Sequence, residues 1–231
     1  MQLSKRLAAV ARLVSAGSRL ADVGTDHGYV PISLVCEGKI PSAIAMDVNR
    51  GPLNRARAHI KAQGLEKYID TRLSDGLAAL APGEADSVLI AGMGGMLMMR
   101  ILSQGQAHWD TVREWILQPQ SEIGGVRHFL AEAGFLITDE DMVKEDGKYY
   151  PMFRAVRGNT DYETEREFLF GKALLDQKHP ILKEWLGKEN QKVQRVLETL
   201  NAQNTEGARS RQRELEQYHR EIQEALSVYE M

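Results

Sequence analysis

The sequence predicts an α/β protein in which a mostly parallel, doubly wound sheet is followed by an α-helical hairpin. Two observations carry this prediction. Through residue 158, short apolar runs alternate with helical patterns, as in parallel strands joined by crossover helices. From residue 159 the strand-like runs vanish and apolar residues return at heptad spacing, which indicates long helices. We therefore expect two domains, residues 1–158 and 159–231.

The bulk composition limits the class of protein. The chain has 231 residues, of which 43% are hydrophobic and 26% charged, as is ordinary for a globular protein. No apolar run approaches the ~20 residues of a membrane span. Arg12 interrupts the apolar part of the N-terminal segment, which is more typical of an amphipathic helix than of a signal peptide. The single cysteine, Cys36, excludes an intramolecular disulfide and a cysteine-ligated metal, so we expect no metal and a cytoplasmic location.

Five short apolar runs have the length and composition of strands. The runs lie within Arg19–Gly24, Ser42–Asp47, Tyr68–Gly76, Ala85–Gly92 and Glu114–Pro119. Helical patterns follow four of these runs. They extend from about Val30 to Glu37, Pro52 to Gln63, Met96 to Ser103 and Gly125 to Gly134. The alternation predicts helices on both faces of a parallel sheet.

The last part of the first domain has a different pattern. Two extended runs in residues 135–157 flank Asp146-Gly147, a dipeptide typical of hairpin turns. We expect this hairpin to add an antiparallel strand to the sheet.

The second domain is predicted to be an antiparallel coiled-coil hairpin. A helix near Thr164–Gln177 is expected to end before Pro180. Two heptad stripes follow, separated by the polar turn NAQNTEGARS. The stripes consist of Leu182, Leu186, Val193, Val196 and Leu200, then Leu215, Tyr218, Ile222, Ala225 and Tyr229. Such a hairpin can dimerise, brace the first domain or hold a substrate, and periodicity does not choose among these roles.

Polar residues follow the predicted strands, where a doubly wound sheet binds its ligands. The segment DVGTDHGY follows the first strand, DVN the second, SDG the third, AGMGG the fourth and QPQ the fifth. Gly24 and Gly28 permit a tight turn and close approach of the backbone to a ligand. Asp47 lies where an acid could accept hydrogen bonds from two ribose hydroxyls, and Asp75 could contact an adenine amine.

The first turn argues against a dinucleotide. Its glycines are spaced G-x-x-x-G, and Asp26 stands where a pyrophosphate would meet repulsion. S-adenosylmethionine has no phosphate and carries a sulfonium and an ammonium, so carboxylates in the turn favour it. We therefore expect S-adenosyl-L-methionine as the cofactor.

The segments LADVGTDHGYVP, AIAMDVNRGPL, RLSDGL, IAGMGG and ILQPQ resemble those of the bacterial tRNA (adenine(22)-N1)-methyltransferases. The resemblance implies a class I Rossmann-like methyltransferase domain that transfers a methyl group to N1 of adenosine 22, with tRNA as partner. It implies that Asp22, Gly24, His27, Asp47, Asp75 and Gly76 form the donor pocket, and we add Gly28, Tyr29 and Val48 to that set. It also places Gly92, Met93, Gly94 and Gly95 between the methyl group and the target base.

Methyl transfer to adenine N1 needs no covalent enzyme nucleophile, because the nitrogen lone pair is free at neutral pH. Catalysis is expected to come from alignment of the reacting atoms. Methylation makes the base cationic, so a carboxylate could stabilise it or accept a proton from N6. Asp26 is the first candidate for this role.

The N-terminal segment is predicted to contact RNA. Residues 1–21 contain basic residues and no acid, and Lys5, Arg6 and Arg12 are the expected phosphate contacts. The alternative interpretation of these charges is a solvated helix face.

Two other functions remain open at this level. The same donor pocket could serve a methyltransferase of a small molecule or protein, or a non-catalytic module that binds the donor. The working expectation is a monomer without membrane contact.

Overall fold

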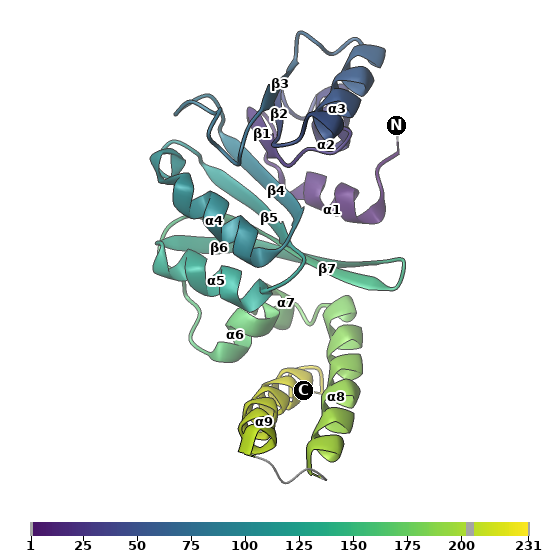
Figure 1. Cartoon of the computed structure of the whole chain (residues 1–231), viewed down its shortest axis with the longest axis vertical. Coiled ribbons are helices and arrows are strands. Elements are labelled where there is room, and N and C mark those ends of the chain that lie inside the picture. The colour runs from purple at the N-terminus through teal and green to yellow at the C-terminus, as the bar shows by residue number, and fades with distance from the viewer. Residues whose placement is uncertain (1, 202–205, 231) are drawn as a thin grey trace. The chain divides into compact units, whose positions relative to one another are not determined.

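The structure is a computed structural model that describes residues 2–201 and 206–230. It divides into two compact units, Met1–Asp161 and Tyr162–Met231, coloured purple to green and green to yellow in Figure 1. No helix within the described ranges combines the length and hydropathy that a membrane crossing requires.

Seven strands of the described chain form one sheet in the first unit, in the order β3-β2-β1-β4-β5-β7-β6. The strands are β1 Leu20–Val23, β2 Ala43–Asp47, β3 Ile69–Leu73, β4 Ser87–Met93, β5 Glu114–Pro119, β6 Phe135–Glu145 and β7 Lys148–Arg157. Strands β1 to β5 are parallel, and β1 pairs with β2 on one side and with β4 on the other. The strand order therefore reverses beside β1, which confirms the predicted doubly wound arrangement.

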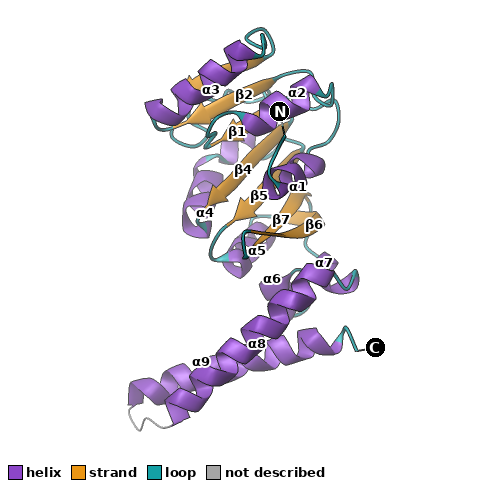
Figure 2. Ribbon diagram, turned by 90° about the vertical axis from the view of Figure 1, so that its right-hand side faces the viewer, coloured by secondary structure: helices purple, strands orange, loops and turns teal. Residues whose placement is uncertain are grey.

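Helices cover both faces of this sheet (Figures 1 and 2). They are α1 Lys5–Leu13, α2 Tyr29–Cys36, α3 Arg50–Ala62, α4 Gly95–Gln104 and α5 Ile123–Glu132. A 3₁₀ turn, η1, spans Gln106–His108.

The strands bury alternate side chains on opposite faces. In β4, Val88 and Ile90 join the core with helices α4 and α5, whereas Leu89 joins the core with α1, α2 and α3. In β5, Trp115 belongs to the first core and Ile116 to the second. This two-residue period explains why these strands read as continuous apolar runs, because both of their faces are covered.

The predicted hairpin forms, but it contributes two strands to the sheet instead of one. Strand β7 pairs antiparallel with β5, and β6 pairs antiparallel with β7 at the edge. Strand β7 therefore lies between β5 and β6, although it follows β6 in the chain. The sequence pattern marked the hairpin but carried no signal for which arm would meet β5.

The prediction of a single helix over Thr164–Gln177 was wrong. Two short helices form instead, α6 Glu165–Phe170 and α7 Lys172–Asp176. Gly171 separates them with φ +94°, a conformation outside the helical region that glycine adopts without a side-chain penalty.

The two long helices of the second unit, α8 Pro180–Asn201 and α9 Glu206–Ser227, pack together (Figure 2). Leu182, Leu186 and Val193 of the first predicted stripe are buried, as are Ile222 and Ala225 of the second. Val196 is exposed and borders a hollow that Val193, Leu215 and Tyr218 also line. Residues 202–205 of the predicted turn lie outside the described residues.

A buried ion pair joins α5 to β6. The Arg127 guanidinium lies 2.8–2.9 Å from the Glu140 carboxylate through its Nε and Nη2 atoms, and both side chains are at most 1% exposed. The same guanidinium lies over the Phe153 ring, 5.2 Å from its centroid. Breaking such a pair leaves one charge buried without a counter-charge.

We expect Glu140→Gln to lower the free energy of unfolding by about 3–5 kcal/mol, because the Arg127 charge would stay buried. Urea unfolding followed by circular dichroism measures this loss. The neighbouring Asp141→Asn is the control, since its partner Arg12 is 65% exposed and the pair should contribute at most about 1 kcal/mol. Equal losses in the two variants would contradict the role of burial.

Candidate functional site

The turn between β1 and α2 has an unusual backbone. Gly24, His27 and Gly28 have φ of +78°, +66° and +68°, so three of five consecutive residues are left-handed. The N–H groups of Gly24 and Thr25 both donate to the Met46 carbonyl at 2.8 Å, which fixes the turn against the end of β2. Left-handed backbone suits the two glycines but costs energy at His27.

A hydrogen bond supports the strained residue. Nδ1 of His59, from α3, lies 3.0 Å from the His27 carbonyl oxygen. A carbonyl can only accept, so His59 Nδ1 carries a proton and donates it. His59 thus positions the turn from the neighbouring helix, a role that the sequence did not suggest.

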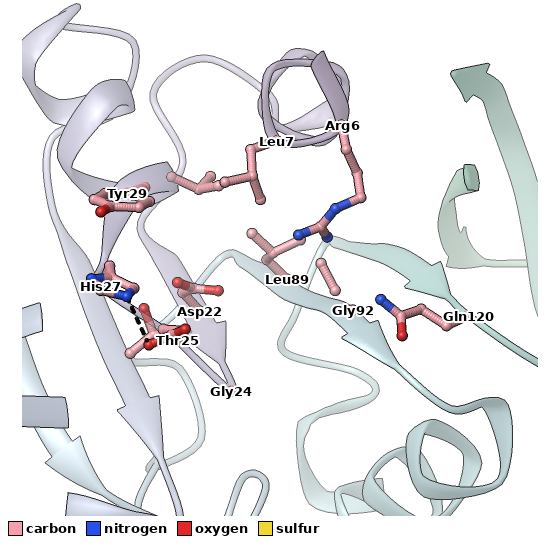
Figure 3. Close-up of a pocket in the computed structure, with 13 residues that line it drawn as sticks. Arg6, Leu7, Asp22, Gly24, Thr25, His27, Tyr29, Leu89, Gly92 and Gln120 are labelled. Carbon is pink, nitrogen blue, oxygen red and sulfur yellow. Dashed lines mark ion pairs between the residues drawn. The ribbon is translucent and has the colours of Figure 1, made fainter. Parts of the chain in front are cut away.

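A cavity of about 340 Å³ opens beside this turn, between β1 and β4 (Figure 3). Six residues predicted for donor binding or catalysis line it, together with one predicted for RNA binding. The six are Asp22, Gly24, Asp26, His27, Tyr29 and Gly92, and the seventh is Arg6. The strand-end pattern therefore named six of the residues that line this cavity.

Other lining residues were not predicted. They are Leu7, Thr25, Val30, Leu89, Ala91 and Gln120. Gln120 follows the fifth strand in the QPQ segment, so its position was a usable signal. Leu7 had no signal, because nothing in the sequence brings α1 to the end of β1.

Asp22 is the most perturbed acid of the cavity. Its carboxyl group points into the cavity in Figure 3, and its residue is only 8% exposed. Burial, with a smaller contribution from the Asp47 charge, raises the pKa of Asp22 to about 6. Asp22 and Asp47 lie on the paired strands β1 and β2, so their charges repel, and a ligand that carries a positive charge would relieve this repulsion.

The remaining predicted donor residues lie along the neighbouring strand ends and do not line this cavity. Asp47 is buried, and its Oδ1 accepts the Asn49 N–H at 2.7 Å. Val48 is 58% exposed, and Asp75 lies 3.7 Å from Arg100. Gly28 lies against α3, where a Cβ atom would come within 3.4 Å of Ala56.

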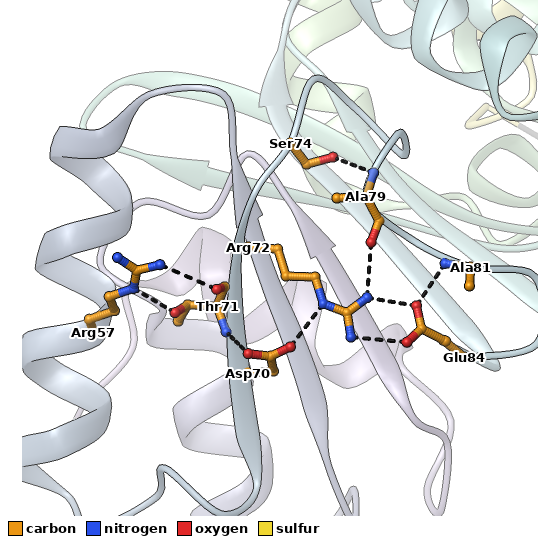
Figure 4. Close-up of polar contacts among 8 residues, drawn as sticks. All are labelled: Arg57, Asp70, Thr71, Arg72, Ser74, Ala79, Ala81 and Glu84. Carbon is orange, nitrogen blue, oxygen red and sulfur yellow. Dashed lines mark hydrogen bonds and ion pairs between the residues drawn. The ribbon is translucent and has the colours of Figure 1, made fainter.

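The loop that carries Asp75 and Gly76 is held by a polar network (Figure 4). Arg72 of β3 donates to both oxygens of Glu84, at 2.6 and 3.0 Å, and to the Ala79 carbonyl at 2.9 Å. Ser74 Oγ donates to the Gly76 carbonyl and accepts the Ala79 N–H. The Arg72 hydrogen bonds lower the pKa of Glu84 to about 2. The network thus keeps the end of β3 in one conformation.

The glycine segment after β4 divides into two parts. Gly92 lines the cavity, and a Cβ atom there would lie 3.5 Å from Arg6 Nη1. The Met93 side chain covers Gly24, where a Cβ atom would meet Met93 Cε at 2.1 Å. Gly94 packs against Ser121, and a Cβ atom at the neighbouring Gly95 would collide with the Ser121 carbonyl at 2.5 Å. Gly94 and Gly95 therefore serve close packing of α4 against the loop after β5.

Asp26, the predicted catalytic carboxylate, lies at the mouth of the cavity and its side chain is 59% exposed. Its Oδ1 accepts a hydrogen bond from Nη2 of Arg55 at 2.7 Å and lies 3.5 Å from His27 Nε2. The Arg55 charge offsets part of the field that this carboxylate could apply to a cationic base.

The three predicted RNA contacts of α1 have different surroundings. Arg6 points into the cavity, donates to Gln118 Oε1 at 2.9 Å and lies over the Tyr150 ring. Arg12 pairs with Asp141 at 3.0 Å. Lys5 is exposed. The acid-free segment does not therefore form one continuous basic face.

Sheet order and strand-end cavity together define a methyltransferase of Rossmann-like fold, and a family model described as "Methyltransferase domain" matches residues 3–153. The tRNA (adenine(22)-N(1))-methyltransferase of Bacillus subtilis (strain 168) is 34% identical over 222 residues, which cover 93% of each chain. The chain belongs to the family of tRNA (adenine(22)-N(1))-methyltransferases. This membership supports the predicted class of enzyme over a methyltransferase of other substrates and over a binding module.

Two solved structures agree with this assignment. The B. subtilis m1A22 tRNA methyltransferase TrmK superposes with a TM-score of 0.90 at 32% identity, over 97% of this chain and 99% of that chain. Streptococcus pneumoniae Sp1610 in complex with S-adenosyl-L-methionine superposes with a TM-score of 0.88 at 35% identity, over 97% of this chain and 100% of that chain. Both similarities extend across the two units.

The raised pKa of Asp22 predicts that the free energy of unfolding depends on pH. Its folded-state pKa of about 6 exceeds the ordinary value of 3.8, so the native state holds the proton more tightly and loses stability as pH rises from about 4 to 6. We expect Asp22→Asn to raise the free energy of unfolding of the ligand-free protein by roughly 2–3 kcal/mol at pH 8 and to change it little at pH 4. Urea unfolding at both pH values measures the difference.

Asp110→Asn is the control, because the Asp110 side chain is 90% exposed. It should change the unfolding free energy by no more than about 0.5 kcal/mol at either pH. If Asp22→Asn does not raise the free energy of unfolding at pH 8, the buried carboxyl group has no raised pKa.

Proposed function

We propose that this protein transfers a methyl group from S-adenosyl-L-methionine to N1 of adenosine 22 in tRNA. The observation that carries the proposal is the cavity at the strand-order reversal, with Asp22 buried and protonatable at its base. Family membership supports the choice of tRNA and of the N1 position.

The donor fits the groups at the strand ends. The carboxyl group of Asp22 suits the ammonium of the donor, and that of Asp47, at the end of the neighbouring strand, suits its ribose hydroxyls. His27 Nδ1 is buried without a hydrogen-bond partner in the described chain, which leaves a polar atom for a ligand to meet. Asp75 and Gly76 follow β3, where the adenine ring would lie, and the exposed Val48 side chain would supply an apolar contact to it.

Arg6 receives a role different from the predicted phosphate contact. Its guanidinium and the Asp22 carboxyl enter the cavity from different elements, α1 and β1 (Figure 3). A cation and an acid so placed suit the carboxylate and ammonium of one amino-acid group. We therefore assign Arg6 to the donor's carboxylate end, and Lys5 and Arg12 stay the predicted RNA contacts on this helix.

The bound donor supplies an electrophilic methyl carbon on a sulfonium. The residues of the chain align the acceptor with that carbon, which accounts for most of the expected rate acceleration. Gly92 leaves space for a base to approach. The Met93 side chain packs over Gly24, and Gly94 packs this segment against Ser121. Asp26 stabilises the cationic product or accepts a proton from N6, and Gln120 is placed to hydrogen-bond a base edge.

The direct test is incubation of the protein with methyl-labelled donor and total tRNA, followed by digestion to nucleosides and mass spectrometry. We expect 1-methyladenosine, and primer extension should stop at position 22. A tRNA with guanosine at position 22 is the matched control and should gain no label. Label in another nucleoside, or none from a folded protein that binds the donor, would refute the proposal.

The proposed role of Asp47 has its own test. Asp47→Ala should weaken donor binding by about 1.5–3 kcal/mol, because a charge-assisted hydrogen bond to ribose is lost. Isothermal titration calorimetry measures the affinity, and circular dichroism verifies the fold. Asp110→Ala removes an exposed carboxylate and should bind the donor like the wild type. Unchanged affinity in folded Asp47→Ala would exclude the ribose contact.

A further inference from the structure

A second cavity, of about 370 Å³, shares Tyr29 with the first. Its lining consists of Gln2, Tyr29, Ile32, His59, Ala62 and Gln63. None of the six residues is an acid, which makes this cavity unsuited to the ammonium or sulfonium of the donor.

Tyr29 and His59 line this cavity, and the ring of His27, which lines the first cavity, stacks with both of them. The rings of His27, Tyr29 and His59 are parallel within 12–17°, and their centroids are 4.9–5.4 Å apart. Parallel rings with accessible edges and faces bind other flat rings by stacking. The His59 ring is held in orientation by its hydrogen bond to the His27 carbonyl, so the stacked rings are in place before any ligand arrives.

The rest of the lining matches a heterocycle with a polar edge. Ile32 and Ala62 provide an apolar surface, and the side-chain amides of Gln2 and Gln63 each offer a donor and an acceptor. Amide side chains pair with the edges of nucleobases through such donor–acceptor sets.

The helix that forms one side of the second cavity is strongly basic. Helix α3 carries Arg50, Arg55, Arg57 and Lys61 and has no acid between its ends. Arg55 pairs with Asp26, whereas no carboxylate of the described chain lies within ion-pair distance of Arg50, Arg57 or Lys61. Arg50, Arg57 and Lys61 lie about half a turn from His59 on the opposite flank of α3, so Arg55 is the cation of this helix on the same flank as the cavity lining.

We propose that the second cavity binds a nucleobase of the RNA substrate that neighbours the target adenine in the strand. This inference rests on the proposed function and adds a subsite to it. The target base approaches the donor beside Gly92, the neighbouring base stacks on Tyr29 and His59, and the amides of Gln2 and Gln63 hydrogen-bond its edge. Both bases leave the RNA stack together, so the enzyme selects a strand that can open at two consecutive positions.

Filling the second cavity tests the subsite. Ala62→Leu places a larger apolar side chain in the lining at the exposed end of α3, and both residues favour helix, so the fold should persist. We expect the tRNA dissociation constant to rise roughly tenfold, as when one base loses its stacking partner. Filter binding with tRNA measures this change, and calorimetry should show unchanged donor affinity.

Ala58→Leu is the matched control, because Ala58 is exposed on the same helix and does not line the cavity. It should bind tRNA like the wild type. Gln63→Ala provides an independent variant that removes an amide and adds no volume, and its tRNA dissociation constant should rise about threefold from the loss of a hydrogen bond.

The outcomes separate the two proposals. Wild-type tRNA affinity in both Ala62→Leu and Gln63→Ala, from a protein that methylates tRNA, would overturn the subsite and leave the function intact. Equal losses in Ala62→Leu and Ala58→Leu would also overturn it, because the effect would then belong to the helix surface. Failure of the wild type to methylate tRNA would instead refute the proposed function.

Discussion

The left-handed turn from Gly24 to Gly28 is the constraint on which the site depends. Its three residues with positive φ reverse the chain within the length of the turn and bring the start of α2 back over the end of β1. The turn follows Asp22 at the base of the cavity and carries Asp26 to its mouth and Tyr29 into the lining of both cavities. Two N–H groups bonded to Met46 and one carbonyl bonded to His59 fix the turn from opposite sides. A larger residue at Gly24 would meet both an unfavourable φ and the Met93 side chain.

Charge within the first unit is arranged around this turn. Burial raises the pKa of Asp22, so part of the stability of the ligand-free protein is lost at neutral pH and is recovered when a cation binds. At the end of β3 the charges of Arg72 and Glu84 are paired with each other, so the ionised carboxylate of Glu84 is stabilised and its loop is held in place. The site thus combines a rigid support with one acid whose ionisation favours the ligand, as expected for a preorganised binding site.

Glycines after β4 illustrate how one motif serves several physical purposes. In AGMGG, Gly92 gives a ligand access to the backbone, whereas Gly94 and Gly95 let α4 approach the loop after β5. A substitution at Gly95 would therefore act through packing, and one at Gly92 through the cavity. The two kinds of effect are separable by measuring stability and donor affinity in the same variants.

The sequence by itself determined the doubly wound sheet, the helical hairpin and the strand-end residues Asp22, Asp26 and Tyr29, because periodicity and turn chemistry are local properties. Tertiary structure decided which arm of the β6–β7 hairpin pairs with β5, since both arms have strand-like patterns. It also decided that Arg6 enters the cavity while Arg12 pairs with Asp141, because helix orientation depends on packing. The Arg127–Glu140 pair joins α5 to β6, and the ring cluster joins His59 of α3 to His27 and Tyr29; such contacts between different elements leave no local pattern to read.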